Sequence, residues 1–384
     1  MALAVAIAGA LLCLAAMAGC GFCVHAGMAV ARYRPSPVEA KGPEPDVTLL
    51  KPLCGDEPRL EAGLRSFLEQ DYGGAVRMRL GVQRPDDPVL PLARRLAEHP
   101  GVSVVEDGAV HGANAKVSNL VNLQRAAPLA ELVVQSDSDI AVRPDYLRRL
   151  AAALAGEGVG LATCLYLGAA ARGGLPARLG AMFVSYSGFP LFAVGVALGA
   201  TPAMGSTLAM RTETLEAIGG FAAVKDVLAD DYAIGRAVRS ELRLSVVSPP
   251  FLVSHGHAEA SFAETWAHEL RWSKTTQGLD PAGHAGSVVT HATPLALLGA
   301  LLLAASQPSL LPPAVLLLLV TILARLWLKS RVDRAAGAAT GPWWLLPIRD
   351  MMSFAVFVGA YLTPRVDWRG ARFHVGRGGK LTPV

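Results

Sequence analysis

Charged side chains are scarce in this chain of 384 residues, of which 17% are Asp, Glu, Lys or Arg and 52% are apolar. That composition is more apolar than is usual for a soluble protein and indicates a membrane protein. The formal net charge is only +4, aromatic residues make up 6% of the chain, and no basic run is interleaved with them. Nucleic acid is therefore not an expected partner.

Cysteine is also sparse, with five residues in the chain. Cys20 and Cys23 lie inside an apolar run, where packed or lipid-facing thiols are expected, and no second cysteine pair accompanies them. The sequence therefore predicts neither a disulfide framework nor a structural zinc site, which suits a reducing, cytosolic environment for the polar part of the chain.

A long apolar run begins the chain. Residues 2–30 carry no Asp, Glu, Lys or Arg, and Arg32, Arg34 and Lys41 follow them. We predict an N-terminal transmembrane helix over residues 1–31 rather than a cleaved signal peptide, because a signal peptide would begin with basic residues. The positive-inside rule then places the next domain in the cytoplasm, and a bacterial inner membrane is the expected location.

Further apolar runs near the end predict C-terminal membrane helices over residues 290–365, followed by a basic cytosolic tail at 366–384. The stretches 293–305 and 310–328 are expected to form a hairpin. The next run contains Arg349 and Asp350, so the number of crossings stays open. Residues 182–200 are also apolar, but Ser, Gly and Pro interrupt them, which favours a core or interfacial segment over a span.

Between these membrane segments, residues 45–285 alternate strand and helix patterns. The predicted strands and helices follow one another along the chain in the order 46–53 (strand), 57–70 (helix), 76–83 (strand), 87–100 (helix), 102–107 (strand), 114–127 (helix) and 131–137 (strand). Such alternation predicts an α/β domain with a parallel sheet and ligands at the carboxyl ends of its strands.

Two aspartates follow the last of these strands in the sequence "SDSDI". Asp137 and Asp139, two positions apart, repel each other unless a cation lies between them. A divalent metal such as Mg²⁺ or Mn²⁺ that carries a diphosphate would supply that cation, because hard cations bind carboxylates together with phosphate oxygens. The alternative is a turn in which an Asp caps the following helix.

Other acidic pairs strengthen the first interpretation. Asp86 and Asp87 follow a neighbouring strand, where a carboxylate can hold the base or ribose of a nucleotide. Asp230 and Asp231 begin an amphipathic helix, where an ionised carboxylate can accept a proton. Capping of that helix is the alternative role for Asp230.

A last motif is "HELRW", in which His268, Arg271 and Trp272 share one helix face. The arginine can neutralise a departing diphosphate, and the tryptophan can offer a flat surface to a sugar or lipid. An interfacial helix with a Trp anchor is the alternative. The histidines of "SHGH", His255 and His257, are given no role, since polar loop histidines are seldom metal ligands.

The ordered motifs "LLKPLCGDEP", "QRPDDP", "NAKVSNL", "SDSDI", "MGSTLAMR", "LADDYAIG" and "HELRW" together resemble the ceramide glucosyltransferase family and its bacterial lipid-glycosylating relatives. The resemblance covers about residues 45–280. It implies a GT-A (Rossmann-like) glycosyltransferase domain, and the likeness is strongest to the branch associated with hopanoid biosynthesis.

The resemblance also implies roles for individual residues. Asp231 is expected to be the general base, and Arg271 with Trp272 to complete the catalytic site. The residues expected to bind the donor are Pro52, Asp87, Lys116 and Asp137, and those expected to bind the metal are Asp137 and Asp139. His268 departs from the Gln or Arg of the family signature, which leaves its role open.

The expected function is inverting transfer of a sugar, glucose or N-acetylglucosamine, from a UDP-sugar to a hydroxyl of a ceramide-like or hopanoid membrane lipid. A processive polysaccharide synthase is the alternative enzyme, although more membrane helices would be expected of it. A catalytically silent scaffold that binds nucleotide-sugar is the alternative from another class. The oligomeric state is not predicted.

Overall fold

The structure, a computed structural model, describes residues 1–34, 44–363, 366–368, 371–375 and 381–383, and Lys41 of the predicted basic flank lies outside them. The chain forms two compact units. The sheet unit consists of Ser36–Arg172 and Leu198–Ala258, and the helical unit consists of Met1–Pro35, Gly173–Ala197 and Glu259–Val384.

This division differs from the predicted domain at residues 45–285. Residues 173–197 and 259–285 group with the terminal helices and not with the sheet. The first of these segments is strongly apolar and more than half buried among other helices, so it packs with elements of its own kind.

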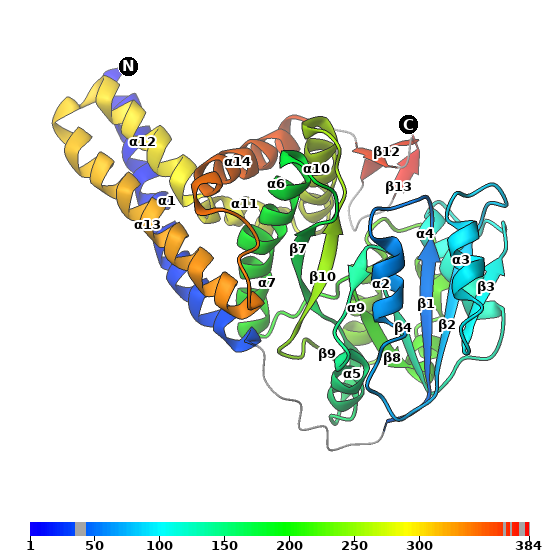
Figure 1. Ribbon diagram of the computed structural model, residues 1–384. Coiled ribbons are helices and arrows are strands. Elements are labelled where there is room, and N and C mark those ends of the chain that lie inside the picture. Colours follow the sequence, from blue (N-terminus) through cyan, green and yellow to red (C-terminus); the bar gives the residue numbers. More distant parts are fainter. Residues whose placement is uncertain (35–43, 364–365, 369–370, 376–380, 384) are drawn as a thin grey trace. The chain divides into compact units, whose positions relative to one another are not determined.

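The sheet unit is built on a seven-stranded sheet with the order β3-β2-β1-β4-β8-β6-β9 (Figure 1). Its strands, in chain order, are β1 (Val47–Leu53), β2 (Val76–Val82), β3 (Val102–Glu106), β4 (Leu132–Gln135), β6 (Val159–Ala162), β8 (Leu208–Arg211) and β9 (Ser245–Val247). The first four lie within the predicted strand ranges, because each is a short β-branched or aliphatic run bounded by turn residues.

The direction of the strands agrees with the prediction in only part of the sheet. β1, β2, β3 and β4 are parallel, whereas β8 is antiparallel to both β4 and β6, so the expectation of an all-parallel sheet is wrong there. Each early strand is followed by one crossover helix, which imposes the parallel direction. Between β4 and β8 the chain instead builds a second sheet and enters the helical unit, so no single crossover fixes the direction of β8.

Alternation along the strands gives the sheet two apolar faces. Leu49 and Val134 belong to one buried cluster, and their neighbours Leu50 and Val133 belong to another. Helices α2 (Leu60–Ser66), α3 (Leu90–Leu96) and α5 (Tyr146–Leu154) cover the first face; α4 (Ala115–Arg125), α8 (Thr212–Ala217), the 3₁₀ turn η3 (Phe221–Val224) and α9 (Asp230–Ser240) cover the second. This three-layer packing holds the carboxyl ends of β1 and β4 in fixed positions.

A second, three-stranded sheet follows the order β5-β10-β7, with β5 (Ile140–Ala141), β7 (Leu165–Ala170) and β10 (Leu252–His257). β10 is antiparallel to β5, and His255 lies opposite Ile140. The histidines of "SHGH" therefore lie on a strand and not in a polar loop, and they are adjacent to the end of the "SDSDI" motif.

The helical unit contains the candidate membrane spans. Four helices of the described chain are long and apolar enough to cross a membrane, or five if a helix pair bent by 71° counts as one span. The single helices are Ala2–Tyr33, Leu175–Ala197, Pro308–Ala336 and Trp343–Leu362. The first consists of α1 and the turn η1, and the second of α6 (Leu175–Phe183), a π-helical turn η2 (Val184–Gly188) and α7 (Phe189–Ala197). The third consists of the turn η5 (Pro308–Leu310) and α13 (Leu311–Ala336), and the fourth of the turn η6 (Trp343–Leu345) and α14 (Leu346–Leu362). The bent pair is Pro281–Thr290 (α11, Pro281–Gly286, and the turn η4, Ser287–Thr290) with Ala292–Ser306 (α12).

Helix α1 (Ala2–Ala29) packs along α12 and α13 (Figure 1). A side chain at Gly9 of α1 would meet the backbone of Gly299 on α12, so both glycines permit close approach. The predicted hairpin at 293–305 and 310–328 corresponds to α12 and α13. Where a basic tail was predicted, the described residues form three short antiparallel strands, β11 (Val366–Trp368), β12 (Ala371–Val375) and β13 (Leu381–Pro383).

Ion pairs explain how α14 accommodates two charged residues. Arg349 donates two hydrogen bonds of 2.7 Å to the carboxylate of Glu269 on α10 (Phe262–Leu279). Asp350 accepts bonds of 2.9 and 2.7 Å from Arg325 on α13. All four side chains are buried, and their charges are compensated within the helical unit.

Candidate active site

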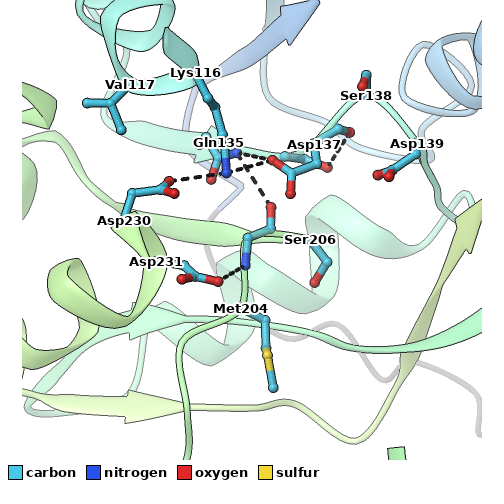
Figure 2. A network of polar contacts seen from close by, with 12 residues as sticks. Lys116, Val117, Gln135, Asp137, Ser138, Asp139, Met204, Ser206, Asp230 and Asp231 are labelled. Atoms are coloured by element: carbon cyan, nitrogen blue, oxygen red, sulfur yellow. Dashed lines mark hydrogen bonds and ion pairs between the residues drawn. The ribbon is translucent and has the colours of Figure 1, made fainter. Parts of the chain in front are cut away.

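Lys116 lies between carboxylates that come from distant parts of the chain. Its ammonium is 2.8 Å from Asp137 Oδ1 and 3.1 Å from Asp230 Oδ2 (Figure 2). Although burial opposes this effect, the charges of Asp137, Asp230 and Asp231 raise the pKa of Lys116 well above its usual value. Lys116 therefore stays charged, and it compensates an acidic cluster at the end of β4.

Helix capping, the alternative role, is not what these aspartates do. The N-cap of α5 is Asp145, and the N-cap of α9 is Ala229. Asp230 is instead buried beside Lys116, and its pKa is raised by burial and, to a smaller extent, by the charge of Asp137. The alternative in which Asp230 serves only as a cap is therefore not what the structure shows. The ammonium that Asp230 faces comes from a helix more than a hundred residues earlier.

Asp231 lies next to this cluster, and its carboxyl group has a raised pKa. Its Oδ2 accepts a hydrogen bond of 2.8 Å from the N–H of Gly205, and its Oδ1 accepts one of 2.7 Å from the N–H of Tyr232. Burial and, secondarily, the charge of Asp230 raise the pKa of Asp231 to about 6, although Lys116 opposes them. At neutral pH the group is ionised, and it is basic enough to accept a proton.

A second lysine lies behind the same loop. Lys51 of β1 is fully buried, and its ammonium donates to the main-chain oxygen of Asp137 (2.7 Å) and to Ser136 Oγ (3.2 Å). Burial lowers the pKa of Lys51 to about 7, against the opposing charges of Asp137 and Asp139. This contact could not be predicted from the sequence, in which Lys51 is one polar residue in an apolar strand.

Asp139 has a different environment from Asp137. Its Oδ2 is 3.3 Å from His255 Nε2, and the His255 ring stacks on Tyr166 with centroids 5.2 Å apart. Its Oδ1 is buried and accepts no hydrogen bond from the residues that the structure describes. A buried carboxylate oxygen without a donor, next to an imidazole, matches the oxygen and nitrogen ligands of a divalent cation.

The remaining predicted donor-binding residues lie at the ends of β1 and β2. Asp87 is buried, and its Oδ1 accepts hydrogen bonds from the N–H groups of Gly55 (2.9 Å) and Val89 (3.1 Å). Asp87 therefore joins the loops that follow these two strands. Pro52 is buried in β1, opposite Gly81 of β2, whereas Asp86 is exposed and pairs with Arg84.

Arg271 and Trp272 belong to the helical unit. Both lie on α10, where the Trp272 ring stacks on Phe183 with centroids 6.3 Å apart. His268 is 4.2 Å from the Trp272 ring, as expected for positions i and i+4, and its Nδ1 is 2.7 Å from Glu259 Oε1. His268 and Trp272 therefore lie on one face of α10, as the sequence predicted for these two residues.

Comparisons with known proteins agree with these observations. A family model described as "Glycosyl transferase family 21" matches residues 7–381. Ceramide glucosyltransferase 1 of Caenorhabditis elegans is 27% identical over 198 residues, which are 51% of this chain and only 42% of that protein. Ceramide glucosyltransferase 3 of the same organism is 24% identical over 352 residues, which are 88% of this chain and 74% of that protein.

Among solved structures, a mannosyltransferase of Pyrobaculum calidifontis in complex with GDP-Man and Mn²⁺ is similar with a TM-score of 0.53 and 22% identity. The match covers 94% of this chain and 99% of the mannosyltransferase. It confirms the predicted GT-A fold, with a mixed sheet in place of a fully parallel one.

Proposed function

The chain belongs to glycosyl transferase family 21, and from that premise we propose that it transfers a sugar from a nucleotide-sugar donor to a hydroxyl of a membrane lipid. The donor is a UDP-sugar that carries glucose or N-acetylglucosamine, and the acceptor is a ceramide-like or hopanoid lipid. One observation carries this proposal: Lys116, Asp137, Asp230 and Asp231 meet at the carboxyl end of β4, where a GT-A domain binds its donor.

The reaction follows from the positions of these groups. The acceptor hydroxyl attacks the anomeric carbon from the side opposite the diphosphate, and its proton passes to the Asp231 carboxylate. The bond between that carbon and the diphosphate oxygen breaks, so the configuration at the carbon inverts. Lys116 faces the departing diphosphate and offsets its charge. Asp87 and Pro52 contribute to holding the nucleotide.

A divalent cation, Mg²⁺ or Mn²⁺, is expected to accompany the donor. Asp137, Asp139 and His255 are the residues that would hold it, because Asp139 Oδ1 has no hydrogen-bond donor among the described residues and His255 Nε2 lies 3.3 Å from Oδ2. When bound, the cation offsets the negative charge on the diphosphate. His255 was not predicted as a ligand, since its strand partner β5 could not be identified from the sequence.

For Arg271 and Trp272 we retain the roles that the family resemblance implies, namely stabilisation of the diphosphate and contact with the sugar or acceptor. The apolar helices of the helical unit support placement of the protein in a membrane. We propose a bacterial inner membrane with the sheet unit in the cytoplasm, on the side of the basic residues that follow α1.

The transfer rate should depend on pH through Asp231. Its pKa is raised to about 6, so kcat/KM should fall about tenfold for each pH unit below that value, as the carboxylate becomes protonated. The charged groups that face it are Asp230 and Lys116. Replacement of Asp230 by Asn removes the charge that raises this pKa and should move the acidic limb to lower pH. A pH profile of wild type and Asp230→Asn checks this prediction, and identical limbs would contradict it.

A direct test uses membranes that contain the full chain, radiolabelled UDP-glucose, UDP-N-acetylglucosamine or GDP-mannose, and extracted lipids, with the products identified by mass spectrometry. We expect one sugar on a lipid hydroxyl from one of the UDP donors. Long polysaccharide products would favour a processive synthase. Donor binding without any product would favour a silent scaffold, and label from GDP-mannose alone would overturn the assignment of the donor.

A further inference from the structure

The "SDSDI" motif brings together two carboxylates that repel each other, so contacts from the rest of the fold have to stabilise the shape of this loop. Main-chain oxygens of the motif accept two of these contacts. The oxygen of Asp137 accepts from Lys51 Nζ at 2.7 Å, and the oxygen of Asp139 accepts from the N–H of Gly256 at 2.8 Å. Between them, Ser138 Oγ donates to Glu57 Oε2 at 2.9 Å. Asp137, Ser138 and Asp139 are therefore all held by contacts that do not use the carboxylates of the two aspartates.

Among the residues that make these contacts, Lys51 is unusual because it is a fully buried lysine. Its side chain is inaccessible to solvent, and an ammonium is costly to bury. Three groups surround its three N–H donors: the Asp137 main-chain oxygen, Ser136 Oγ, and the face of the Phe67 ring, whose centroid is 3.6 Å away. These contacts restrict the Lys51 side chain, and β1, which lies between β2 and β4 inside the sheet, fixes its backbone.

The two lysines of the site act on different atoms of Asp137. Lys116 pairs with the side-chain carboxylate, which has to be released when a diphosphate and its cation bind. Lys51 bonds to the main-chain oxygen, a contact that binding of the donor does not need to disturb. The Asp137 carboxylate can therefore exchange Lys116 for a cation, while Lys51 holds the main chain of the loop in place.

We propose that Lys51 is a positioning residue that holds the Asp137–Asp139 loop in the shape required to bind the donor diphosphate and its divalent cation. The inference rests on the proposed function. It does not assign Lys51 any contact with the donor. Outer contacts of this kind typically change metal affinity or activity by about 10–100-fold when they are removed.

The test compares Lys51→Met with Thr48→Val in the purified full chain. Methionine fills a similar volume without donating, whereas Thr48, also fully buried in β1, accepts from the N–H of Ala130 at 2.9 Å, far from the acidic loop. Mn²⁺ binding is measured by electron paramagnetic resonance, UDP binding by calorimetry, and folding by thermal unfolding. We expect Lys51→Met to weaken binding of Mn²⁺ and UDP at least about tenfold and to raise the donor KM more than it lowers kcat. Thr48→Val should lose stability only.

The direction in which the Mn²⁺ affinity changes distinguishes a positioning role of Lys51 from an effect of its positive charge alone. If Lys51 acted only through its positive charge, its removal would strengthen Mn²⁺ binding; stronger or unchanged binding would overturn the proposal. Should Lys51→Met fail to fold, Ser136→Ala removes one acceptor of Lys51 and is expected to weaken Mn²⁺ binding in the same direction, so an unchanged affinity there would also overturn it. A wild-type chain that binds neither Mn²⁺ nor UDP would instead refute the proposed function.

Discussion

Replacement of Asp231 by Asn is expected to lower sugar transfer by a factor of about 10²–10⁴ and to leave donor binding nearly unchanged. Asparagine has the same shape, and its single oxygen can accept from the N–H of Gly205 or of Tyr232, so the change removes one of these two hydrogen bonds and leaves the rest of the site in place. It cannot accept a proton from an attacking hydroxyl. The loss should therefore appear in kcat, measured with the UDP-sugar donor and lipid acceptor, and not in the Kd for UDP.

Glu241→Gln is the matched control for this experiment. Glu241 is the C-cap of the same helix, α9, and is exposed, so the change in charge is the same and the acidic cluster is untouched. Activity close to wild type is expected of it. If Asp231→Asn kept more than about a tenth of the wild-type rate, another group would have to be the base.

The second large effect concerns stability of the helical unit. Removal of one partner of the buried Arg349–Glu269 pair is expected to cost about 3–5 kcal/mol, because the remaining charge is left without compensation. The two single variants should differ. Burial raises the pKa of Glu269 to about 7 even though Arg349 opposes it, so in Arg349→Met the carboxyl can take up a proton. In Glu269→Gln the buried guanidinium cannot lose its proton, and this variant should be the less stable one.

Thermal unfolding in detergent measures this difference. The double variant Glu269→Met/Arg349→Met should recover most of the stability, since an apolar pair of similar volume replaces the ion pair. The exposed pair of Arg65 and Glu61 provides the control, and Arg65→Met should change the stability by at most about 1 kcal/mol. Equal losses at both pairs, or a double variant less stable than either single one, would contradict this explanation.

The Arg349–Glu269 pair also bears on function. Glu269 lies two residues before Arg271 on α10, and Arg349 also donates to the main-chain oxygen of Leu179 at 3.3 Å. The pair therefore fixes the helix that carries the "HELRW" motif to α14 and α6 within the helical unit. In the sequence, Arg349 is only a charge inside an apolar run, because its partner Glu269 is 80 residues away.

Much of the fold could be predicted from local patterns. The first four strands, their helices and the apolar segments at both ends have a periodicity or length that few other structures satisfy. Where a contact depends on distant residues, local patterns failed: the antiparallel direction of β8, the grouping of residues 259–285 with the helical unit, and the contact of His255 with Asp139 were not predicted. Each depends on which segments pair in space, and strand pairing leaves no trace in the sequence of either strand alone.

The amino-acid sequence alone is enough to predict that the chain has long apolar helices, that it contains an α/β domain, and that its acidic residues follow strands or begin helices. These properties depend on composition and on the order of residues along the backbone. Which charges meet depends instead on the folding of the whole chain: Lys116 pairs with Asp137 and Asp230, Lys51 with the main chain of Asp137, and Arg349 with Glu269. The reason is physical, since burial of a charge is favourable only with a partner at bonding distance, and that partner is fixed by the packing of the whole domain.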